Sequence, residues 1–291
     1  MINPPGASAV ALVMVALGHA GAGLQLLANV RRNEALIIFD LLSQRQCPAS
    51  TLLLLHSRAL GLLSISGAAL ALASAPEGER SRPVCCSMAA GAAASLGQLR
   101  LDAAASPAAV LQCSTIVASL NCARATHVAT RRRGASPRDA VCSSPSAAHL
   151  RGWRIARPWA PRAPRAPRRA VATMAGTLAL LAGGAAIAAP GASAELCFDC
   201  IGASRVPLSR AVRSTAATVL LPLGAGRLAL EAGPQVDGAS TTGDSGRRRL
   251  ALTVAAGGIA QAALLARSAH AVGLKRWARR ALLALLGALA F

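Results

Sequence analysis

The sequence predicts an all-α, multi-pass membrane protein with about four to six transmembrane helices and a long disordered loop rich in arginine and proline. Three observations predict this class. Uncharged segments long enough to cross a hydrocarbon core of roughly 30 Å recur along the chain. Clusters of arginine separate these segments, as in loops at a membrane surface. Hydrophobic residues make up 54% of the 291 residues but aromatic residues only 2%, so large side chains are too scarce for a water-soluble core.

The net charge of +20 has two explanations. Lys275 is the only lysine, so arginine carries nearly all of the positive charge. The charge could attract anionic lipid, or it could reflect the codons of a GC-rich gene. In its extreme form, the second explanation makes the chain a spurious GC-rich reading frame. Nucleic acid is not the expected partner, because the arginine-rich segment offers only Trp153 and Trp159 for base stacking.

Residues 1–82 are predicted to form a hairpin of two membrane helices. The first covers about 7–29, and the second covers 52–75. Arginines outnumber acidic residues in the loop between them, which places that loop on the cytosolic or stromal side by the positive-inside rule. His19 and Gln25 lie within the first helix. Polar residues inside a membrane are candidates for function, although they can also simply hydrogen-bond neighbouring helices.

Residues 83–169 are predicted to form a low-complexity linker rich in Arg, Ala, Pro and Ser. A marginal helix over 103–123 would carry the chain back across the membrane and place the following arginines on the same side as the first loop. Residues 124–169 hold twelve arginines and repeat Ala-Pro-Arg, a composition typical of polyproline II or disorder. This segment could lie on anionic lipid.

Residues 170–194 carry no charge, which predicts a membrane-spanning helix between Arg169 and Glu195. The same stretch has the form of a secretory or thylakoid-lumen signal. It has a basic start and an apolar middle, and Pro190 then precedes the small residues Ala192 and Ala194. Cleavage after Ala194 is therefore the alternative to a retained span. The region upstream resembles a transit peptide in composition, which leaves a plastid or another organelle open as the location.

Residues 170–291 are predicted to form the C-terminal membrane helices. A tilted helix over about 207–230 is interrupted by Pro222, and a further span covers 250–273. An amphipathic tail follows, which would lie at the interface or cross half of the membrane. Its basic arc contains Lys275, Arg276, Arg279 and Arg280, and its apolar arc contains Leu274, Trp277, Leu282 and Leu285.

The pair Cys197 and Cys200 is the clearest chemical motif. A Cys-x-x-Cys spacing suits a redox disulfide or half of a metal site. No second cysteine pair and no nearby histidine completes a zinc tetrad, so the sequence predicts neither a metal nor a cofactor. It also holds no phosphate-binding or dinucleotide-binding glycine motif.

These observations favour an integral membrane protein that is not an enzyme: an assembly subunit, a scaffold or a small carrier. The expected partners are the lipid bilayer and other membrane helices. Two other functions remain open. One is a membrane-bound thiol-redox protein that uses Cys197 and Cys200, and the other is a presequence-bearing protein cleaved after Ala194.

Overall fold

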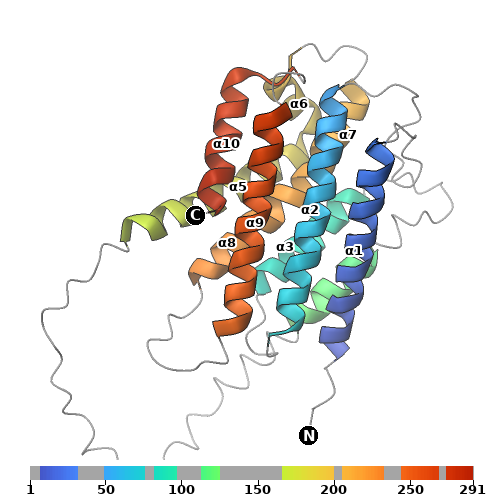
Figure 1. The fold of residues 1–291 in the computed structure, drawn as a ribbon, viewed down its shortest axis with the longest axis vertical. Helices are drawn as coiled ribbons and strands as arrows, with labels where there is room; N and C mark the ends of the chain where they lie inside the picture. Colours follow the sequence, from blue (N-terminus) through green and yellow to red (C-terminus); the bar gives the residue numbers. More distant parts are fainter. Residues whose placement is uncertain are drawn as a thin grey trace, which may run out of the picture.

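The computed structural model describes residues 7–31, 49–75, 82–96, 113–124, 166–199, 205–232, 244–268 and 273–290. These residues form helices and no strand, which confirms the all-α class. The long helices lie side by side in one bundle (Figure 1). Among the described residues, four helices are long and apolar enough to cross a membrane.

The first two of these helices form the predicted N-terminal hairpin. Helix α1 (Ala7–Arg31) and helix α2 (Ala49–Ala73) run antiparallel. Gly23 on α1 lies against the backbone of α2 near Ala59, because a glycine leaves room for two helix backbones to approach. Helix α1 begins at the first residue of the span predicted over 7–29 and ends two residues beyond it.

The other two spanning helices come from the C-terminal half. Helix α5 (Ala166–Ala188) covers 170–188 of the uncharged span predicted over 170–194, and helix α9 (Asp244–Ser268) covers 250–268 of the span predicted over 250–273. Helix α6 (Pro190–Cys197) follows α5 after a break at Ala189, where proline starts a new helix, as its fixed φ favours.

Three consecutive elements make residues 205–232 helical without a break. They are helix α7 (Arg205–Thr215), the π-helical turn η5 (Ala216–Leu220) and helix α8 (Leu221–Ala232). We call this stretch the central helix, because α2, α3, α5 and α9 all pack against parts of it. It matches the tilted helix predicted over about 207–230.

The π-helical turn has a local cause in Pro222. Proline has no backbone N–H, and its ring would clash with the carbonyl group four residues earlier, that of Thr218. The wider turn relieves this clash: the N–H of Leu221 donates to Ala216 rather than to Ala217. The carbonyl groups of Ala217 and Thr218 thereby lose their α-helical donors.

Two glycines from neighbouring helices lie directly over those two carbonyl groups. A Cβ atom added to Gly61 of α2 would lie 2.7 Å from the carbonyl oxygen of Thr218. A Cβ atom added to Gly91 of α3 would overlap the carbonyl oxygen of Ala217. The central helix is therefore packed backbone to backbone, and only glycine fits at these positions.

The sequence did not predict helix α3 (Arg82–Leu96). Its apolar part, Val84–Ala94, is too short to span the membrane at about 1.5 Å per residue. Residues 113–124 form a second short helix, which overlaps the second half of the predicted crossing at 103–123. The remainder of that prediction lies outside the described residues, as does most of the arginine-rich stretch of 124–169.

Helix directions define two ends of the bundle. At the first end, helices α1, α5 and α9 begin, and helix α2 and the central helix end. The chain between α2 and α5 therefore starts and finishes at the same end, which differs from the single crossing that the sequence predicted. At the second end, helix α10 (Arg276–Ala290) turns back along α9, with Gly258 against Leu286 and Ala290. The predicted amphipathic tail thus packs into the bundle.

The backbone contact at Gly91 can be tested by substitution. Gly91→Val should lower the melting temperature of the detergent-solubilised protein by about 3–10 °C, since overpacking a tight contact costs about 1–3 kcal/mol. Gly184→Val is the matched control, because nothing lies within 4 Å of a Cβ atom added there. Equal effects of the two substitutions would contradict the close packing of α3.

Candidate functional site

The outward faces of the four spanning helices carry large apolar side chains. Met14 on α1, Leu181 on α5 and Leu252 on α9 are each more than 60% exposed. In water, such surfaces would be unfavourable, whereas a bilayer covers them with hydrocarbon. Further exposed residues on these faces are Val10, Leu17, Leu24, Leu70, Val171, Met174, Leu178 and Ile259.

Polar side chains lie inside the same bundle. This placement is the reverse of that in a water-soluble protein and is typical of membrane helices, where polar groups face one another rather than lipid. The buried polar and charged residues are His19, Arg58, Ser66, Thr115, Ser119, Ser214, Thr218 and Gln261. We call this set the polar interior.

His19 lies near the middle of the span formed by α1 and links α1 to the helix of residues 113–124. Its Nδ1–H donates to the carbonyl oxygen of Val15 over 2.8 Å. With this proton on Nδ1, Nε2 accepts from the hydroxyl group of Thr115, 3.3 Å away. One turn beyond Thr115, the hydroxyl group of Ser119 is buried and has no hydrogen-bond partner among the described residues. The predicted candidate His19 is therefore part of the polar interior.

Gln25, the other candidate in this helix, is exposed on the outer surface of α1. Gln25 is six residues after His19, and six residues of α-helix correspond to a rotation of about 240° around the helix axis. The two side chains therefore lie on different faces of α1. The structure thus separates two residues that the sequence grouped together.

Arg58 is buried on the face of α2 that meets the central helix. One turn before it, the carbonyl oxygen of Leu54 accepts from the hydroxyl group of Thr215 over 3.1 Å. One turn after it, Gly61 lies against Thr218. Arg58 therefore lies beside the π-helical turn, and only 4% of it is exposed. An arginine near the start of a membrane span commonly extends its charged end to the interface, whereas the structure buries this one.

A reciprocal pair of hydrogen bonds joins α2 to α9. The hydroxyl group of Ser57 donates to Oε1 of Gln261 over 2.6 Å, and Nε2 of Gln261 donates back to the carbonyl oxygen of Ser57 over 2.7 Å. Both polar ends of the glutamine side chain are thereby satisfied between helices. Sequence reasoning missed this pair because its members are 204 positions apart.

The proposed processing residues Ala192 and Ala194 both lie on α6. Ala192 is exposed, but Ala194 is fully buried, and its carbonyl oxygen accepts from the N–H of Phe198. A protease needs an accessible, extended segment. In the described arrangement, the peptide bond after Ala194 does not offer one.

Cys197 ends α6 as a half-buried free thiol, and Cys200 lies outside the described residues. Backbone hydrogen bonds join this segment to the start of α10, where the N–H of Lys275 donates to the carbonyl oxygen of Cys197. Burial raises the pKa of the Cys197 thiol, and the positive charge of Lys275 offsets part of that increase. A raised pKa reduces the thiolate that redox chemistry requires.

Within the described residues, no group of three or more His, Cys, Asp or Glu side chains could hold a metal ion. No protein-family model, curated protein or solved structure matches this chain. The interpretation of the site therefore depends on the geometry of the chain itself.

The different contributions of His19 and Gln25 to the stability of the protein can be measured. His19→Leu should lower the melting temperature in detergent by about 2–4 °C, because an interhelical hydrogen bond in a membrane protein is worth about 0.6 kcal/mol and the ring also packs inside the bundle. Gln25→Leu, its control on the outer surface, should leave the temperature unchanged. Combining His19→Leu with Thr115→Val should cost less than the sum of the two single changes. Strict additivity would exclude the bond between His19 and Thr115.

The reactivity of Cys197 gives a separate test. Its alkylation by iodoacetamide should reach half of the maximal rate above about pH 8.5, the pKa of an ordinary thiol, because burial disfavours the thiolate. Lys275→Met should move this midpoint to still higher pH, and Lys275→Arg should not. Quantifying the labelled peptide by mass spectrometry between pH 7 and pH 10 provides the measurement. A midpoint well below pH 8 would indicate an activated thiol.

Proposed function

We propose that this chain is a non-enzymatic component of a membrane, acting as an assembly subunit or scaffold built from a multi-pass helical bundle. The observation that carries the proposal is the distribution of side chains. Large apolar residues cover the outer faces of four spanning helices, and polar residues lie between them. A bilayer satisfies such a surface, and the interior satisfies the polar groups.

The hydrogen bonds between helices support a role in assembly. His19 bonds to Thr115, Ser57 bonds to Gln261, and Thr215 bonds to Leu54. Each bond joins two different helices, so these donors and acceptors hold the bundle together. This use of polar groups favours an assembly subunit over a small carrier, whose polar groups would have to contact a substrate.

The two alternative functions receive less support. A thiol-redox role needs an accessible thiolate, but Cys197 is half buried and its pKa is raised. Cleavage after Ala194 needs an accessible peptide bond, but Ala194 is buried within a helix.

Mass spectrometry of alkali-washed membranes tests the proposal. Alkali removes peripheral proteins and leaves proteins that span the bilayer, so peptides from this chain should stay in the membrane pellet. Peptides from α1, α5 and α9 should come from a single polypeptide rather than from two fragments.

Three results would contradict the proposal. Release of the chain by alkali or high salt would indicate binding by charge, since such binding weakens as salt rises. A new N-terminus at Glu195 would support the presequence function. Alkylation of Cys197 and Cys200 that depends on reductant would support the thiol-redox function.

A further inference from the structure

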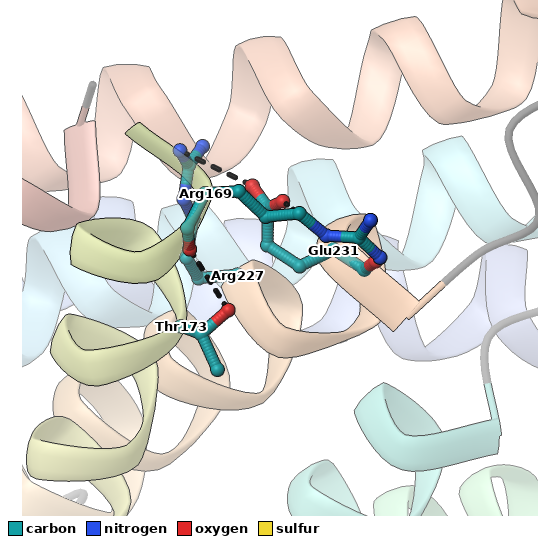
Figure 2. A network of polar contacts seen from close by, with 4 residues as sticks. All are labelled: Arg169, Thr173, Arg227 and Glu231. Atoms are coloured by element: carbon teal, nitrogen blue, oxygen red, sulfur yellow. Dashed lines mark hydrogen bonds and ion pairs between the residues drawn. The ribbon is translucent and has the colours of Figure 1, made fainter. Parts of the chain in front are cut away.

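Two arginines meet one glutamate at the first end of the bundle. Arg169 lies in the first turn of α5, whereas Arg227 and Glu231 lie one turn apart on α8. Figure 2 shows the carboxylate of Glu231 between the two guanidinium groups. Nη2 of Arg169 also donates to the backbone carbonyl oxygen of Glu231 over 2.7 Å. This contact satisfies one of the carbonyl groups that the end of a helix leaves without a donor.

The two ion pairs are loose. Nε of Arg169 lies 3.8 Å from one carboxylate oxygen of Glu231, and Nη2 of Arg227 lies 3.4 Å from the other. Both distances exceed the usual range for charge-assisted hydrogen bonds, about 2.7–2.9 Å. Each guanidinium group has five N–H donors. One carboxylate at these distances therefore leaves donors available, chiefly on Arg169, whose side chain is 54% exposed.

Two more arginines lie at the same end. Arg248 and Arg249 are exposed in the first turns of α9, and α9 runs antiparallel to α8, with Gly226 against Val254. We call Arg169, Arg227, Arg248 and Arg249 the arginine end. Their four positive charges exceed the single negative charge of Glu231, with which two of them pair.

The arginine end lies at the depth of lipid headgroups if the bundle spans a bilayer, so the inference rests on the proposed function. The candidate spans begin at Arg169 on α5 and at Arg248 on α9. A span of 20 residues is about 30 Å long, which is the thickness of the hydrocarbon core. Arginines at the first position of such spans lie where lipid phosphate groups are found.

We propose that the arginine end binds the phosphate group of an anionic lipid, with Arg169 as its principal donor and the largely buried Arg227 beside it. Planar guanidinium groups bind phosphate oxygens through paired N–H donors. Glu231 holds the two arginines near one another and removes part of their charge.

Native mass spectrometry of the full-length protein can measure this binding. The protein is mixed with equal amounts of phosphatidylglycerol and phosphatidylcholine, and the ratio of retained lipids is recorded. Arg169→Gln and Arg227→Gln should each lower the preference for phosphatidylglycerol about fivefold, because a basic residue near a membrane contributes about 1 kcal/mol. Glu231→Gln should maintain or increase the preference, since it removes a competing negative charge.

The matched controls are Arg276→Gln and Arg280→Gln, two exposed arginines of α10 at the second end. They remove the same charge and should change the preference less than twofold. Equal losses in both sets would mean general attraction to anionic lipid and would overturn the proposal, as would no loss in either set. Displacement of phosphatidylglycerol by millimolar glycerol 3-phosphate would show a soluble phosphate ligand and would overturn the assignment to lipid.

Failure of this proposal can be told apart from failure of the proposed function. A chain that stays in alkali-washed membranes, but whose variants keep the full preference for phosphatidylglycerol, contradicts only the lipid site. A chain that alkali releases contradicts the proposed function first. The melting temperature of each variant in neutral detergent shows whether a loss of lipid reflects unfolding, and a variant that melts early is replaced by the corresponding lysine variant.

Discussion

The backbone around Pro222 constrains the whole bundle. Because proline lacks an N–H group, the central helix widens into a π-helical turn and leaves two carbonyl groups without their usual donors. In hydrocarbon, such groups are costly, so this part of the chain has to be enclosed by protein. Gly61 and Gly91 provide the enclosure, since they allow α2 and α3 to approach the turn backbone to backbone. The central position of residues 205–232 follows from this need.

The rest of the arrangement follows from enclosing the central helix. Once α2, α3, α5 and α9 surround it, their inner faces are shielded from lipid and can hold polar groups such as Arg58 and Gln261. Their outer faces remain against lipid and are apolar. Small residues at the closest helix contacts also explain a composition that is rich in alanine and poor in aromatic residues. The feature that argued against a water-soluble core is thus the feature that permits close helix packing in a membrane.

The sequence predicted the long helices well because absence of charge over about 20 residues is a strong local signal. It missed α3, a short helix with Pro83 in its first turn and several Ser and Cys residues. It identified His19 but could not distinguish its environment from that of Gln25, since helical periodicity gives the angle between two side chains without showing which one faces the bundle. The hydrogen-bonded pairs between helices, such as Ser57 with Gln261, depend on tertiary contacts that have no local signal.

Two arginines also fix how α5 lies along the central helix. At the first end, Arg169 of α5 donates to the backbone of Glu231, and at the second end, Nε of Arg213 on α7 donates to the carbonyl oxygen of Ile187 over 3.1 Å. In the first bond α5 donates to the central helix, and in the second the central helix donates to α5. Sliding α5 by one turn along the central helix would break both bonds. The stretch of α5 between them matches the thickness of the hydrocarbon core. These arginines therefore set the depth of the helix pair in the bilayer as well as its register, because a shift in depth would draw one guanidinium group into hydrocarbon.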